Sequence, residues 1–90
     1  MVSETVSSGG MYFGPIMSVS PGASPFTWQN PENVRVQMFV SLGTVTAVEF
    51  SPDNSTYINC GILAGAIIVN PRQYLRITYV LAPTLNYIPI

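Results

Sequence analysis

The residues of this chain that are able to do acid–base chemistry are few and scattered. There is no histidine, and the chain has only three basic and four acidic residues in 90 positions. Glu49 and Asp53 are the closest pair of carboxylates along the predicted strands, and two carboxylates can share general acid–base work. A solvated glutamate at a strand end and a solvated aspartate in a turn is the simpler interpretation, and we expect no catalytic residues and no enzyme.

Cys60 is the single cysteine, so an intramolecular disulfide is excluded. A small buried apolar side chain is the interpretation we favour for it. An intermolecular bridge or a nucleophile is the alternative, although a nucleophilic cysteine needs a base and no histidine is present. Metal sites need clustered His, Cys, Asp or Glu. The four acids are spread along the chain, so we expect neither a metal nor a cofactor.

The low number of charged residues is the strongest compositional signal. They make up 8% of the chain, against about 25% in an ordinary globular domain. Hydrophobic residues make up 48%, more than a core of this size can bury, so we expect much of the surface to face another protein. Three arginines without lysine make a poor footprint for nucleic acid or an anionic membrane, and we expect neither as a partner.

No segment predicts a membrane span or a secretory signal. The longest nearly apolar run, from Cys60 to Val69, is about ten residues long, whereas a bilayer requires roughly 20. The N-terminus lacks a basic segment followed by an apolar one. Both observations favour synthesis in the cytoplasm as a subunit of an assembly.

Residues 1–24 are predicted to form an extended arm. Ser7 to Gly10 is a flexible stretch, and prolines and a glycine interrupt the chain between residues 15 and 25. Ordering about 24 residues costs on the order of 24–48 kcal/mol of backbone entropy, which an arm recovers only through extensive contacts. We therefore expect its apolar residues to dock on a neighbouring subunit. They are Tyr12, Phe13, Ile16 and Met17.

Residues 25–90 are predicted to form one all-β domain. Apolar and polar residues alternate over 34–40, 44–50 and 74–80, and shorter strands are predicted at 57–60, 66–69 and 85–88. The tight Leu42-Gly43 link predicts a hairpin between the first two. Short strands at roughly ten-residue spacing indicate a small antiparallel sandwich or barrel of jelly-roll type. One helical turn at 61–66 is the alternative we keep open.

Three residues of this domain are candidate partner contacts. Arg72 and Arg76 are able to pair with Glu32, Glu49 or an acid on a partner, and ordinary surface arginines are the alternative. Trp28 lies in the polar sequence Thr-Trp-Gln-Asn, which favours a contact residue over a core residue. The other aromatic residues divide between the core and a sugar-binding surface.

Four segments carry a resemblance to a known group of proteins. They read SPFTWQNP (24–31), GTVTAVEFS (43–51), NPRQYLRITY (70–79) and APTL (82–85). In this order they resemble small β-rich structural proteins of tailed bacteriophages, over residues 24 to 89. Arg72-Gln73 departs from the Gly-Asp of those relatives, and Asn54-Ser55 departs from their turn glycine.

The resemblance implies a capsid decoration (cement) protein on the surface of the virion. Such proteins sit as homotrimers and clamp neighbouring copies of the major capsid protein. A tail, baseplate or head–tail connector component is the first alternative, and copy number per particle distinguishes the two. A carbohydrate-binding module that uses Trp28 and tyrosines is the second.

Overall fold

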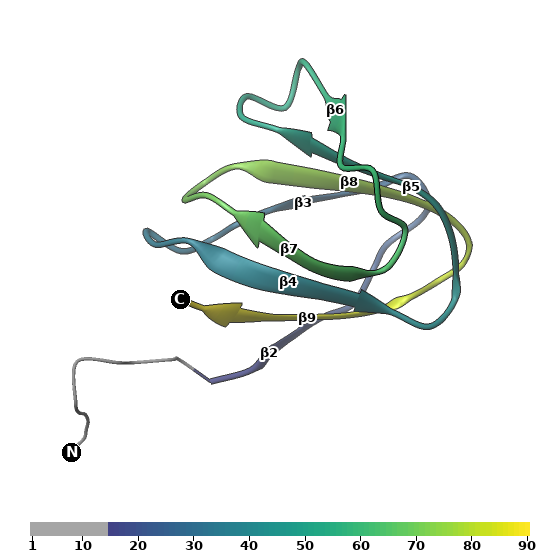
Figure 1. Ribbon diagram of the computed structural model, residues 1–90, viewed down its shortest axis with the longest axis horizontal. Coiled ribbons are helices and arrows are strands. Elements are labelled where there is room, and N and C mark those ends of the chain that lie inside the picture. Colours follow the sequence, from purple (N-terminus) through teal and green to yellow (C-terminus); the bar gives the residue numbers. More distant parts are fainter. Residues whose placement is uncertain (1–14) are drawn as a thin grey trace.

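The computed structural model describes residues 15–90, which form strands and no helix (Figure 1). The strands are β2 (Met17–Val19), β3 (Phe26–Gln29), β4 (Val36–Ser41), β5 (Thr44–Ser51), β6 (Ile58–Asn59), β7 (Gly65–Val69), β8 (Tyr74–Leu81) and β9 (Thr84–Pro89). The all-β prediction is confirmed, and no helical turn forms at 61–66.

The strands form two antiparallel sheets packed face to face. One sheet has the order β2-β9-β4-β7 and the other β3-β8-β5-β6. Every connection except β5–β6 crosses from one sheet to the other (Figure 1). This is the strand order of an eight-stranded jelly roll, so the predicted jelly-roll sandwich is confirmed.

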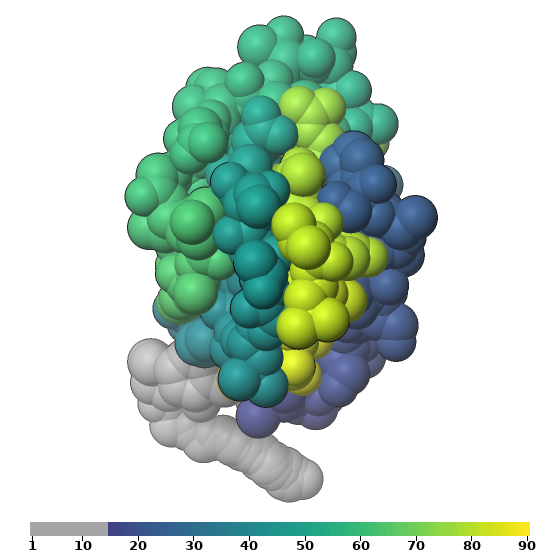
Figure 2. Space-filling view, turned by 90° about the vertical axis from the view of Figure 1, so that its right-hand side faces the viewer, coloured from purple at the N-terminus to yellow at the C-terminus, as the bar shows by residue number. Residues whose placement is uncertain are grey.

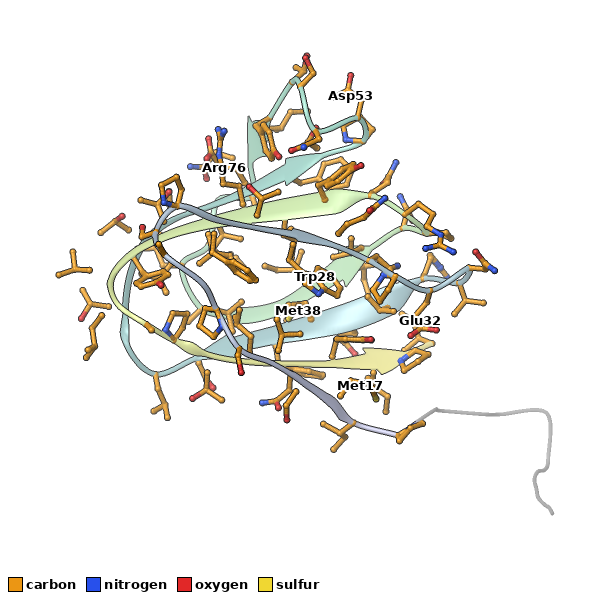
Figure 3. All side chains as sticks on the ribbon, turned by 180° about the vertical axis from the view of Figure 1, so that it is seen from behind. Met17, Trp28, Glu32, Met38, Asp53 and Arg76 are labelled. Carbon is orange, nitrogen blue, oxygen red and sulfur yellow. The ribbon has the colours of Figure 1, made fainter. Side chains whose placement is uncertain are left out.

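The core follows the alternation in the sequence. Val36, Met38 and Val40 of β4 face Leu75 and Ile77 of β8 across the interior, and all five are buried. In Figure 3, Met38 lies between the two sheets. Because successive side chains of a strand point to opposite faces, one alternating run supplies one wall of the core.

The predicted hairpin between β4 and β5 is wrong. β4 pairs with β7 and β9, whereas β5 pairs with β6 and β8, so the two strands lie in different sheets. The connecting residues Leu42 and Gly43 both have positive φ, at 62° and 67°. The local sequence is that of a two-residue hairpin turn. Here each strand instead buries its apolar face against the opposite sheet.

The N-terminal arm is described only from residue 15 onward. Tyr12 and Phe13 lie outside the described residues. Met17–Val19, within the predicted arm, forms edge strand β2 and pairs with Leu85–Tyr87 of β9. The backbone of this part of the arm is therefore hydrogen-bonded to a sheet of its own chain. The side chain of Ile16 is exposed.

Because consecutive strands run in opposite directions, the connections gather at two ends of the sandwich (Figure 1). One end carries the connections at 20–25, 42–43, 60–64 and 82–83, and we call it the apolar end. The other carries those at 30–35, 52–57 and 70–73, and we call it the charged end.

Candidate interaction surfaces

The charged residues of the described chain are segregated. Glu32, Arg35, Asp53 and Arg72 lie in the three connections of the charged end, and Glu49 and Arg76 lie on β5 and β8. The four connections of the apolar end contain no charged residue, and neither do β2, β9, β4 and β7. One sheet and one end of the sandwich are therefore uncharged.

Arg76 forms an ion pair and a cation–π contact within its own chain. Its Nε donates to Glu49 Oε1 at 2.9 Å, across the β5–β8 pair, and its guanidinium lies 3.9 Å from the centre of the Tyr57 ring. The hydrogen bond to Glu49 raises the pKa of Arg76 above its ordinary value. Figure 3 shows Arg76 on the outer side of its sheet. Glu49 is the acid with which it pairs, and a contact with a partner stays a prediction.

Arg72 lies at the charged end, in the turn between β7 and β8. Gln73 N donates to Asn70 O at 3.1 Å, and Arg72 has a φ of 63°. Proline at the second position and positive φ at the third are the features of a type II turn, which favours glycine at the third position. One guanidinium nitrogen of Arg72 donates to Asn33 Oδ1 at 3.1 Å, which ties this turn to the β3–β4 connection.

Trp28 lies in the core. Trp28 lies between the two sheets (Figure 3) and is 8% exposed. Its ring packs against that of Tyr87 with 5.2 Å between centroids. Because the indole is enclosed by its own chain, we exclude Trp28 from the candidate interface. The polar neighbours that suggested exposure, Thr27 and Gln29, point to the other face of β3.

The charged end is held together by a buried asparagine that the sequence did not single out. Asn30 is completely buried, and its Nδ2 lies 3.0, 3.2 and 3.1 Å from the carbonyl oxygens of Val34, Val69 and Asn70. Its Oδ1 accepts from Glu32 N at 2.9 Å, and its own N donates to Gln73 O. One side chain therefore satisfies polar backbone groups of two connections.

Asp53 organises the turn after β5. Its Oδ1 accepts from the backbone N of Ser55 and Thr56, and from the Ser51 hydroxyl. Hydrogen bonds from Thr56, Ser55 and Ser51 lower the pKa of this carboxyl. Glu49 is bonded to Arg76 instead, so the two carboxylates serve separate structural contacts.

The apolar end exposes large hydrophobic side chains. Leu42 is 78% exposed, Val80 79% and Leu81 63%, and Ile62 and Leu63 of the neighbouring connection are also exposed. Figure 2 looks onto this end, where the teal β4–β5 connection and the yellow-green β8–β9 connection lie side by side. Register agrees, because Thr44 pairs with Leu81. Large exposed hydrophobic side chains gathered at one uncharged end are of the kind that mark association.

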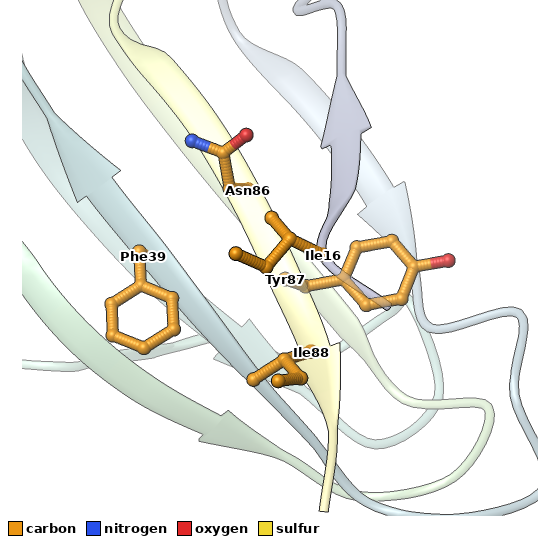
Figure 4. A pocket seen from close by; sticks show the side chains of 5 residues that line it. All are labelled: Ile16, Phe39, Asn86, Tyr87 and Ile88. Atoms are coloured by element: carbon orange, nitrogen blue, oxygen red, sulfur yellow. The ribbon is translucent and has the colours of Figure 1, made fainter. Parts of the chain in front are cut away.

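A second apolar surface covers the outer face of the sheet β2-β9-β4-β7. A hollow of about 400 Å³ lies there, lined by Ile16, Phe39, Asn86, Tyr87 and Ile88 (Figure 4). Ile16 is the predicted arm residue that the structure brings to this hollow, and Met17 lies in the adjoining edge strand, partly exposed. We call this surface the sheet face. Arg72 and Arg76 lie away from it, on the charged end and on the other sheet.

Cys60 is partly buried and packs against the core. Burial raises the pKa of its thiol, and the nearby Glu49 charge adds to the effect. The thiolate is the reactive form, so we expect Cys60 to react with iodoacetamide more slowly than the same cysteine in the urea-unfolded chain between pH 7 and 9. Rates that coincide in the folded and unfolded protein would contradict this environment.

Comparisons with known proteins add no relative: no protein family model, curated protein or solved structure matches this chain. Within residues 15–90, no three His, Cys, Asp or Glu side chains lie close enough to hold a metal ion. The same residues include no helix with the length and hydropathy needed to cross a membrane. The fold and the two apolar surfaces are therefore the observations from which function is argued.

Proposed function

We propose that this protein is a virion structural protein, a capsid decoration (cement) subunit that stabilises a phage head by bridging neighbouring capsid proteins. The observation that carries the proposal is the presence of two separate uncharged apolar surfaces, the apolar end and the sheet face, on one small sandwich. A bridging subunit needs two contact surfaces. Jelly rolls are common among viral capsid domains, which supports the proposal by analogy.

The mechanism is burial of apolar surface, which stabilises by about 25 cal/mol per Å² removed from water. Neither surface carries a charge on its strands or connections, so binding requires no charged group to be desolvated there. A stable pairwise interface buries about 1,600 Å² in total. Contacts to several neighbours on a capsid surface multiply that area without any catalytic group.

The partners in this proposal are the major capsid protein and further copies of this chain, arranged as a homotrimer. The sheet face is the surface we assign to the capsid, where Ile16 lines the hollow. Tyr12, Phe13 and Met17 of the arm stay predicted contact residues. Arg72 and Arg76, both already bonded within the chain, set register at the margins of an assembly.

The carbohydrate-binding alternative used an exposed Trp28 together with tyrosines as stacking platforms. Trp28 is buried, so this alternative is left with its tyrosines alone. A tail, baseplate or connector role uses the same apolar surfaces, and copy number separates it from decoration.

The test is binding to phage heads that lack this protein, together with its copy number in complete virions. Phe39→Asp places a charge on the sheet face, and Thr27→Asp places one on the outer face of the opposite sheet. We expect hundreds of copies per particle, and at least a tenfold loss of head binding for Phe39→Asp with none for Thr27→Asp. A few copies per particle would favour the tail or connector role, and equal binding of both variants would refute the assignment of the sheet face.

A further inference from the structure

We infer that the apolar end, centred on Leu42 with Leu63, Val80 and Leu81, is the surface through which copies of this chain bind one another. The inference rests on the proposed structural role, because a subunit that bridges neighbours is what needs a second surface. Its test uses the purified protein alone, so that either idea is able to fail without the other.

Leu42 is unfavourable for the isolated chain on two independent counts. Its φ of 62° lies in the left-handed region, which is strained for most residues and is tolerated best by Gly, Asn and Asp. Its apolar side chain is also 78% exposed to water. An asparagine at this position would relieve the first cost and remove the second. Leucine therefore serves neither the turn nor the solubility of the monomer, and contact with another molecule accounts for both features.

The surface around Leu42 is held in place by backbone packing. The neighbouring Gly43 lies so close to the carbonyl oxygens of Leu81 and Ala82 that a Cβ there would come within 2.6 Å of them. The backbones of the β4–β5 and β8–β9 connections are therefore in direct contact beside Leu42 (Figure 2), and Leu42, Val80 and Leu81 are all exposed at this end. A patch that is already ordered loses little entropy when it binds.

The distribution of charge argues for another copy as the occupant. Around a rotation axis the same residue of each copy approaches its equivalents, so a charged side chain near the axis would face like charges. The connections at 20–25, 42–43, 60–64 and 82–83 contain no charged residue, whereas Glu32, Arg35, Asp53 and Arg72 all lie at the opposite end. Interfaces between identical subunits are also the more apolar class, with charged residues depleted from their centre. The absence of charge from these four connections fits contact between identical surfaces.

The first experiment compares Leu42→Asn with Val34→Asn. Val34 is an exposed hydrophobic residue of the charged end, so the same polar replacement there is the matched control. Sedimentation equilibrium over a concentration series gives the mass of each protein. We expect the wild type and Val34→Asn to form oligomers, and Leu42→Asn to dissociate with at least a tenfold weaker constant. Its thermal midpoint, measured at a dilution where all proteins are monomeric, should equal or exceed that of the wild type.

A monomeric wild type at 100 µM would overturn the inference, and so would a Leu42→Asn variant that associates like the wild type. The thermal midpoint of the dilute Leu42→Asn protein distinguishes weaker association from a folding defect. If that variant does not fold, a second measurement tests the same surface. In a Cys60→Ser background, Leu42→Cys should form disulfide-linked dimers under mild oxidation, whereas Val34→Cys should not. Equal cross-linking of both variants would place the contact elsewhere. Loss of head binding by Leu42→Asn without a change in oligomeric state would identify the capsid as the occupant and refute the inference.

Discussion

Replacing Asn30 with aspartate should destabilise this protein by about 3–5 kcal/mol, a large share of the total stability of a domain of this size. The two side chains have nearly the same shape. In the wild type, Nδ2 of Asn30 lies within 3.2 Å of three backbone carbonyl oxygens in a fully buried position. A carboxylate oxygen there loses the donor hydrogens and places a negative charge against three acceptors. Urea unfolding followed by the fluorescence of Trp28 measures the loss.

Asn33→Asp is the matched control for this prediction. Asn33 belongs to the same connection, but it is exposed and its Oδ1 accepts a hydrogen bond from Arg72. A carboxylate still accepts that bond, so we expect a change within about 0.5 kcal/mol. Equal destabilisation by the two variants would show that negative charge at this end, rather than the donor role of Asn30, decides stability.

The Asn30→Asp variant should also acquire a pH dependence of known sign. Burial against carbonyl oxygens disfavours the charged form, so the folded-state pKa of the new carboxyl lies above its unfolded value of about 3.9. The folded state then binds more protons than the unfolded state between these two pKa values. Stability of the variant relative to the wild type should therefore fall as pH rises from about 4. A variant that instead gains relative stability over this range would contradict the buried donor geometry.

The strands were predictable from the sequence because each buries one face. Residues 36–40 and 75–77 alternate as the pattern indicates, and their apolar members form the core. The pairing of the strands was harder to predict from the sequence. The same two-residue link with two positive φ values is able to join the two strands of a hairpin or two strands of facing sheets. The local sequence therefore does not distinguish these two arrangements. Only the requirement that β4 and β5 both cover the core from opposite sides decides between them.

The roles of individual side chains were not predictable where those roles depend on contacts with residues distant in sequence. Trp28 has polar neighbours in the chain, yet it faces Tyr87, which is far along the sequence. Asn30 looks like an ordinary loop residue, because its carbonyl partners come partly from the end of β7. The low number of charged residues was visible from composition. The gathering of four of them at one end follows from the topology, which places alternate connections at the same end of the sandwich. Local sequence patterns therefore could not predict the apolar end.

Gly43→Ala should unfold this protein or destabilise it by at least about 3 kcal/mol, because two costs combine. The φ of 67° is unfavourable for alanine, and the added Cβ would lie 2.6 Å from the carbonyl oxygens of Leu81 and Ala82. These are backbone atoms, so no side-chain rotation relieves the collision. Chemical denaturation and the thermal midpoint measure the effect.

Gly61→Ala separates the two costs. Gly61 has a φ of 81°, and a Cβ there would meet nothing within 4 Å. We expect it to cost only the left-handed conformation, about 1 kcal/mol. If Gly43→Ala proved no worse than Gly61→Ala, the close approach of the two connections would be refuted. Because that approach joins the connection that carries Leu42 to the end of β8, the same comparison bears on self-association. A Gly43→Ala protein that still folds should associate more weakly than Gly61→Ala, since forcing the connections apart divides the apolar patch that copies of the chain are inferred to share.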